Sequence, residues 1–207
     1  MDIHAPHGGI HSWKDFWLHL VTITAGVLIA LSLEGARESL HNRALVREAR
    51  ANIRREIADN LKELDGELRG MPVQNEHLDN ALKFADEMLA TGHSAIQKLE
   101  LNASNANLRT ASWQTADRTG ALAHMDYGEV QKYADTYSMQ ELYAVTQRRV
   151  VQQLASALAI VSSGDPTRAA RADVEQFRHQ VLEMRGEIYI LEKLGQGLKD
   201  GYRRTLE

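Results

Sequence analysis

The chain has 207 residues, of which 43% are hydrophobic and 25% charged, as in a folded protein with one domain beyond a membrane anchor. The net charge of −4 argues against the basic surface of a nucleic-acid binder, so no nucleic acid is expected as a partner. The absence of cysteine excludes disulfides, thiol catalysis and cysteine metal sites, and the low proline count of three favours long helices.

Residues 1–12 are predicted to form a flexible tail. They include His4, His7 and His11, and imidazoles are good ligands for zinc, copper or nickel. A metal site also needs a shell that holds its ligands in place, and the neighbouring glycines and proline do not provide one. We therefore expect incidental histidines and no metal.

Residues 16–33, FWLHLVTITAGVLIALSL, carry no Asp, Glu, Lys or Arg. At 1.5 Å per helical residue they would cover about 27 Å, just enough to cross a bilayer core. Trp13 and Trp17 stand at one end, where indole rings prefer the headgroup layer. The sequence predicts a transmembrane helix over residues 13–35, in contact with membrane lipid.

Two alternatives compete with a retained span. A cleaved signal peptide would have a basic start and a small-residue cleavage site, whereas this start is neutral and the run continues into charged residues. A core helix would carry a polar stripe, which the run lacks.

Small residues recur every four positions in the span, at Thr22, Gly26 and Ala30. This spacing lets two helices approach closely in lipid, although the same residues are common in membrane helices of every kind. The stripe points to self-association or to packing against another membrane subunit.

Residues 36–207 are predicted to form a helical bundle domain. Apolar residues three or four apart from Val46 to Leu68 indicate that the span continues as one helix. Gly70, Met71 and Pro72 predict a turn, because proline suits the first position of a helix. The next helix is expected to bury Leu78, Leu82, Ala85 and Leu89 and to end at Gly92, with a short helix over residues 95–101 after it.

Asp126 and Glu129 form a capping box that opens another helix. A second box at Ser138 and Glu141 makes a break near Tyr137 plausible. The expected buried positions of this helix follow an apolar pattern: Val130, Tyr133, Tyr137, Leu142, Val145, Leu154, Leu158 and Val161. The Ser-Gly-Asp-Pro run of residues 163–166 predicts the turn that ends it.

The last helix is predicted to begin at Pro166 and carries the most regular pattern in the chain. Its alternation of four and three is typical of a coiled coil, whose partner is the preceding helix, a second copy, or both. The expected seam is Ala170, Val174, Phe177, Val181, Met184, Ile188, Leu191, Gly195, Leu198 and Tyr202. The predicted fold is all-α: one transmembrane helix that continues into an antiparallel bundle of long helices with coiled-coil character.

Trp113 stands among alanines, and Gly120 is predicted to be a turn or a helix stop. A large aromatic side chain of this kind usually packs at the end of a helical bundle. The more specific interpretation is a ligand pocket formed by Trp113, Tyr133 and Tyr137.

The sequence offers little for catalysis. Glu38 and His41 match the Glu-x-x-His step of di-iron bundles, but those sites need two such steps and two further glutamates. There is no phosphate-binding glycine loop, His-Glu-x-x-His motif or nucleophile elbow. We expect a non-enzymatic protein without catalytic residues, cofactor or metal.

The run ITAGVLIALSLE, followed by an arginine-rich helix with IRREIADN, resembles a group of uncharacterised bacterial single-pass membrane proteins. Members share a short N-terminal tail, a Gly-Val-Leu-Ile-Ala-Leu span and a Glu-x-x-x-Asn step, here Glu56 and Asn60. The match is best over residues 13–61, and Trp113 with residues 120–122 is similar in style. The resemblance implies a bacterial inner membrane location and carries over no functional residue.

Four arginines follow the span within about twenty residues, whereas only Lys14 precedes it. The positive-inside rule therefore favours a cytoplasmic domain. The function expected is a membrane-anchored scaffold, an oligomerising element or an accessory subunit of a membrane complex, with further copies or other membrane subunits as partners. The alternative is a sensory or ligand-binding bundle.

Overall fold

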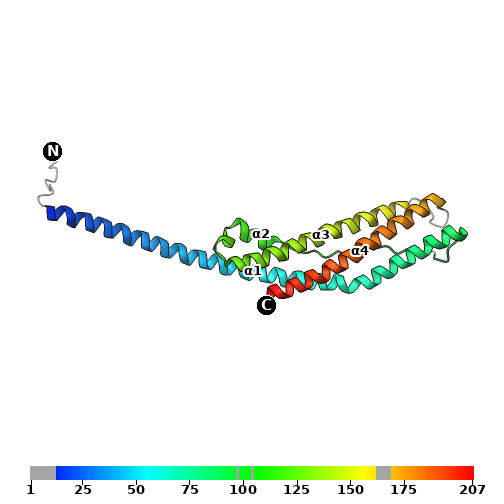
Figure 1. Ribbon diagram of the computed structural model, residues 1–207, viewed down its shortest axis with the longest axis horizontal. Coiled ribbons are helices and arrows are strands. Elements are labelled where there is room, and N and C mark those ends of the chain that lie inside the picture. The colour runs from blue at the N-terminus through cyan, green and yellow to red at the C-terminus, as the bar shows by residue number, and fades with distance from the viewer. Residues whose placement is uncertain (1–12, 97, 104, 162–168) are drawn as a thin grey trace, which may run out of the picture. The chain divides into compact units, whose positions relative to one another are not determined.

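The computed structural model describes residues 13–96, 98–103, 105–161 and 169–207. They form α1 (Trp13–Thr91), α2 (Ala111–Arg118), the short 3₁₀ helix η1 (Ala121–His124), α3 (Tyr127–Val161) and α4 (Arg171–Leu206) (Figure 1). No strand occurs in these ranges, so the prediction of an all-α protein is confirmed. The tail histidines and the turn predicted at residues 163–166 lie outside the described residues.

The chain divides into two units, Met1–Glu48 and Ala49–Glu207, and α1 contributes residues to both. Residues 36–48, which the sequence assigns to the bundle, thus fall in the first unit. Helix α1 is the one described helix that is long and apolar enough to cross a membrane. None of its most apolar window is buried, which contradicts the alternative of a core helix.

The turn predicted at Gly70, Met71 and Pro72 is wrong, because α1 continues through Pro72. An internal proline removes a backbone hydrogen bond and costs about 3 kcal/mol. Met71 and Leu78 on the two sides of it are each only 1% exposed, and burying such side chains gives about 1.5–3 kcal/mol apiece. Pro72 itself faces solvent, where water can satisfy the freed carbonyl. Packing therefore outweighs the local signal.

Helix α1 ends at Thr91, as predicted. Gly92 has φ 77°, in the left-handed region, and its N–H donates to the Met88 carbonyl at 2.9 Å. The short helix expected over residues 95–101 is absent from the described residues there. The Glu87 carboxylate instead accepts hydrogen bonds from the Ser94 hydroxyl at 2.7 Å and the Ala95 N–H at 3.3 Å, which competes with helix formation.

Helix α3 opens as predicted, with the Glu129 N–H donating to Asp126 Oδ1 at 3.1 Å. It does not break near Tyr137. Its expected apolar face is partly wrong, because Leu142 is 52% exposed whereas the neighbouring Tyr143 is fully buried. The buried face of α3 is instead rich in hydroxyl and amide side chains: Tyr133, Thr136, Tyr137, Gln140, Tyr143, Thr146 and Gln147.

Helix α4 lies beside α3 and buries the predicted seam from Val174 to Tyr202 in full. It begins later than predicted. Ala170 is an exposed, extended N-cap residue rather than a seam position, with φ −62° and ψ 148°.

Ion pairs join α4 to α1. Arg178 Nε lies 2.6 Å from Asp86 Oδ1 and Arg185 Nη2 lies 3.0 Å from Asp79 Oδ1. Lys199 pairs with Asp65 further along. Residue numbers rise on α4 as they fall on α1, so the pairs specify direction and register. Exposed pairs contribute at most about 1 kcal/mol each, so the apolar seam supplies most of the stability.

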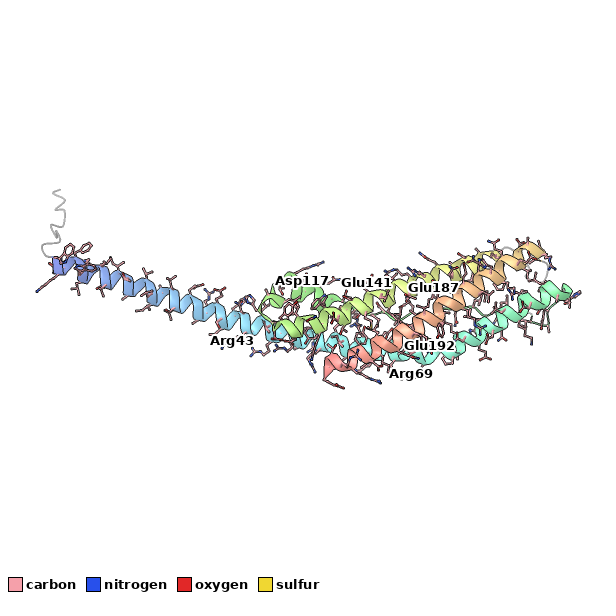
Figure 2. The ribbon with its side chains drawn as sticks, viewed as in Figure 1. Arg43, Arg69, Asp117, Glu141, Glu187 and Glu192 are labelled. Atoms are coloured by element: carbon pink, nitrogen blue, oxygen red, sulfur yellow. The ribbon has the colours of Figure 1, made fainter. Side chains whose placement is uncertain are left out.

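Charged side chains cover the outside of the second unit. Arg69 on α1, Asp117 on α2 and Glu141 on α3 are all exposed, and Figure 2 shows them pointing away from the helices. This surface suits contact with water.

Helices α1, α3 and α4 approach one another closely at Gly195 of α4. A Cβ atom placed there would lie 2.9 Å from Leu68 Cδ2 and 3.0 Å from Tyr143 Cε2. Because Tyr143 is fully buried, its ring has little room to move. Glycine is required here for close approach.

We expect Gly195→Ala to destabilise the protein by about 1–3 kcal/mol through overpacking. Gly186→Ala is the matched control on the same helix, because nothing lies within 4 Å of its Cβ position. It should stabilise by about 0.5–1 kcal/mol through helix propensity. Thermal unfolding of the full chain in detergent, followed by circular dichroism, measures both. Equal stability of the two variants would contradict the close contact.

Candidate functional site

The feature that organises the second unit is an extended segment, residues 105–112, which we call the strap. It lies among helices, ends in the first turn of α2 and has no strand to pair with in the described residues. Its side chains alternate, with Ala106 buried and Asn105, Asn107 and Arg109 exposed. Because buried backbone groups must be hydrogen-bonded, side chains of the neighbouring helices have to supply the partners.

Asn60 of α1 holds the middle of the strap through a pair of hydrogen bonds. Its Oδ1 accepts the Arg109 N–H at 2.8 Å, and its Nδ2 donates to the Arg109 carbonyl at 2.7 Å. Asn60 is only 1% exposed. The amide thus replaces the backbone partner that a neighbouring strand would provide.

Carboxylates of α1 accept other strap amides. Glu67 Oε2 accepts the Ala106 N–H at 2.6 Å, and Glu56 Oε2 accepts the Ser112 N–H at 2.8 Å. Ser112 lies in the first turn of α2, so Glu56 also places a carboxyl group at that helix N-terminus, where negative charge is favourable.

Helix α3 satisfies the strap carbonyls from the other side. Gln140 Nε2 donates to the Arg109 carbonyl at 2.9 Å, and Gln147 Nε2 donates to the Ala106 carbonyl at 3.2 Å. Both glutamines are buried. The strap is therefore recognised through its backbone by α1 and α3 together.

Buried tyrosines complete this polar network. The Tyr137 hydroxyl donates to Glu56 Oε1 at 2.7 Å, and the Tyr202 hydroxyl of α4 donates to Gln140 Oε1 at 2.6 Å. Burial, followed by the hydrogen bond to Glu56, raises the pKa of Tyr137 far above its ordinary value. Burial likewise raises the pKa of Tyr202. Both phenols are neutral donors at any physiological pH.

Arg50 of α1 forms an ion pair with Glu129 at the start of α3. Its Nε and Nη2 donate to the two oxygens of Glu129 at 2.6 and 2.7 Å, and the Tyr133 hydroxyl donates to Glu129 Oε1 at 3.1 Å. The hydrogen bond from Arg50 is the main reason that the pKa of Glu129 lies below its ordinary value. Burial and the adjacent carboxylate raise the pKa of Tyr133 to about 12.

The structure brings the three residues of the predicted pocket together. Trp113 stacks on Tyr137 with ring centroids 5.4 Å apart and an interplanar angle of 18°, and its centroid lies 6.4 Å from that of Tyr133. We call these three rings the aromatic cluster. Binding of a ligand by the cluster stays a prediction.

A cleft of 380 Å³ adjoins the cluster through Tyr133. Its wall carries both signs of charge and comes from the start of α3, from α1 and from the end of the chain. The lining residues are Arg54, Asp126, Gly128, Glu129, Lys132, Tyr133, Thr205 and Glu207.

The predicted membrane residues lie in the first unit. Trp13 and Trp17 contact each other edge to face with centroids 5.9 Å apart, and both are exposed. Thr22, Gly26 and Ala30 are all exposed on α1. The Thr22 hydroxyl donates to the Leu18 carbonyl at 2.8 Å, so this polar group is already satisfied within the helix.

No three His, Asp or Glu side chains gather as metal ligands among the described residues. His179 lies 3.4 Å from Glu183, which makes an ordinary surface pair one helical turn apart.

Sequence reasoning missed the residues that hold the strap. The signal was present on α1, where buried polar residues recur at spacings of four and seven: Glu56, Asn60, Glu67 and Gln74. Polar residues in register with a core face indicate a buried polar partner, here a backbone segment without a neighbouring strand.

No family model, curated protein or solved structure matches this chain.

We expect Asn60→Ala to cost about 1–3 kcal/mol of stability, because it leaves the part-buried Arg109 N–H without its side-chain acceptor. Asn80→Ala is the matched control, since Asn80 is exposed on the same helix, and its effect should stay within about 0.5 kcal/mol. Thermal unfolding and amide exchange of the strap measure the two effects. An Asn60 variant that keeps full strap protection would contradict this assignment.

Proposed function

We propose that this chain is a membrane-anchored helical scaffold that acts as an accessory or oligomerising subunit of a membrane protein complex. The observation that carries the proposal is the apolar window of α1, which has a mean hydropathy of 2.0 and is 0% buried. So large an unburied apolar surface would be unfavourable in water and is favourable in lipid.

Details of the first unit support an anchor. Hydroxyl groups inside the window bond to carbonyls one turn earlier, at Thr22 and Ser32, which lowers the cost of placing them in lipid. Trp13, Phe16 and Trp17 form an aromatic group at one end, as expected at a headgroup layer. The small residues Thr22, Gly26 and Ala30 offer a surface for a second membrane helix.

The second unit supports a structural role. We take it to be an antiparallel bundle with coiled-coil character, on the evidence of the α4 seam and of the opposed numbering of the α1–α4 ion pairs. Its polar network is engaged in holding the strap. A bacterial inner membrane location follows from the resemblance, and a cytoplasmic bundle follows from the arginines after the span.

The anchor is tested by placing charge within it. Val27→Arg with Leu31→Arg costs roughly 2.5–3.5 kcal/mol per arginine and should release the full chain from bacterial membranes under alkaline carbonate wash. Leu40→Arg is the control, because Leu40 is exposed on the same helix beyond the apolar window and should leave the protein membrane-bound.

Intact mass and crosslinking complete this experiment. The retained chain should have the mass of all 207 residues, whereas a cleaved signal would remove the span. Crosslinking in native membranes should capture a second copy or a membrane neighbour. A strictly monomeric protein without neighbours would overturn the scaffold role.

The aromatic cluster and its cleft favour a second candidate, a ligand-binding bundle. A metabolite bound there should raise the melting temperature of the full chain, and Trp113→Ala should abolish that shift. Tyr127→Ala is the control, since Tyr127 is a nearby exposed aromatic residue. Absence of any shift across a broad metabolite set would remove this candidate.

A further inference from the structure

Three buried side-chain atoms in the described residues lack a hydrogen bond of ordinary geometry: Glu67 Oε1, the Tyr143 hydroxyl and Glu187 Oε2. Glu67 is 7% exposed and Tyr143 is fully buried. The first two groups are neighbours, because burial raises the pKa of the Tyr143 phenol and the Glu67 carboxylate beside it raises that pKa further. A buried polar atom left unpaired destabilises the fold.

The other oxygen of Glu67 holds the strap. Glu67 Oε2 accepts the Ala106 N–H at 2.6 Å, next to the carbonyl that Gln147 binds. The carboxyl group therefore has one oxygen on the strap and the other facing Tyr143. A change in the charge of this carboxyl group therefore acts directly on the hydrogen bond that joins α1 to the strap.

The charge of Glu67 has no counterion. Among the described groups that act on it, Glu63 of the same helix is repulsive, Tyr143 of α3 is neutral, and the strap contributes only the Ala106 amide. Tyr202 of α4 acts on Tyr143 and is also neutral. Burial is the main reason that the pKa of Glu67 lies above its ordinary value.

Protonation removes this penalty. Glu67 Oε1 and the Tyr143 hydroxyl can share one hydrogen bond whichever group supplies the proton, so the two states differ chiefly in the buried charge. A buried charge without a counterion is less favourable than a neutral acid with two hydrogen bonds.

We infer that Glu67 is a proton-operated latch on the strap. The protonated carboxyl group bridges the Ala106 N–H and the Tyr143 hydroxyl and keeps the strap fastened. Hydration of the ionised group weakens its hydrogen bond to the N–H of residue 106.

The sign of the pH dependence follows from linkage. A carboxyl group with a raised folded-state pKa stabilises the fold fully below its unfolded pKa, about 4.3, and this contribution is lost as pH rises through the folded-state pKa. Glu129, whose pKa is lowered, contributes in the opposite direction. The effect of Glu67 is therefore read as a difference between variants at each pH.

The test uses the full chain in detergent and compares the wild type with Glu67→Gln, which keeps an acceptor for the Ala106 N–H without the charge. Glu67→Gln should be the more stable protein at about pH 8 and lose this advantage towards about pH 4. Amide exchange at Ala106, corrected for the intrinsic rate, should speed up with pH in the wild type alone.

Glu76→Gln is the matched control, because Glu76 is an exposed carboxylate of the same helix and is not among the groups that act on Glu67. It should retain the pH dependence of the wild type. At about pH 5.5, where ordinary carboxyl groups are mostly ionised, the infrared band of a protonated carboxyl group should be stronger in the wild type and in this control than in Glu67→Gln. A constant stability difference across the pH range, or equal bands in the three proteins at this pH, would overturn the latch.

Discussion

The second unit depends on one requirement: the backbone of the strap must find hydrogen-bond partners although it has no strand beside it. Asn60, Glu56 and Glu67 of α1 and two glutamines of α3 meet this requirement. Each buried, unpaired backbone group would cost about 1–3 kcal/mol of stability, so the path of the strap requires hydrogen-bonding side chains at these positions. Their positions then determine which faces of α1 and α3 turn inward.

This requirement explains why the inner face of α3 is unlike that of α4. Helix α4 packs with an almost purely apolar seam, from Val174 to Tyr202. The inward residues of α3 that bind the strap are the glutamines Gln140 and Gln147, because the strap presents main-chain carbonyls to them rather than side chains. Two neighbouring helices of similar length thus solve different packing problems, one hydrophobic and the other polar.

The difference between these two kinds of packing also determines which features could be predicted from the sequence. The α4 seam from Val174 onwards, the α1 stop at Gly92 and the Asp126 cap each rest on a local pattern, and all three are confirmed. The helix through Pro72 and the inward turn of Tyr143 depend on contacts with segments distant in sequence. Periodicity cannot register such contacts, since apolar scoring favours Leu142 over its neighbour.

The candidate sites follow the same division. The aromatic cluster was predicted from composition around Trp113, and the structure does bring its three rings together. The buried polar residues of α1, Glu56, Asn60 and Glu67, were not predicted from the sequence. Their role becomes visible only with the strap in place, because charge patterning alone cannot distinguish a water-facing carboxylate from one that binds an amide.

Because the strap is recognised through its main chain, its length is constrained more strictly than the identity of its exposed side chains. The outward residues Asn105, Asn107 and Arg109 could be exchanged for many others without touching the amides that α1 and α3 bind. Removing one residue would instead reverse the alternation and turn these polar side chains towards the core. This part of the surface is thus open to diversification during evolution or engineering, provided that the spacing between its attachment points is preserved.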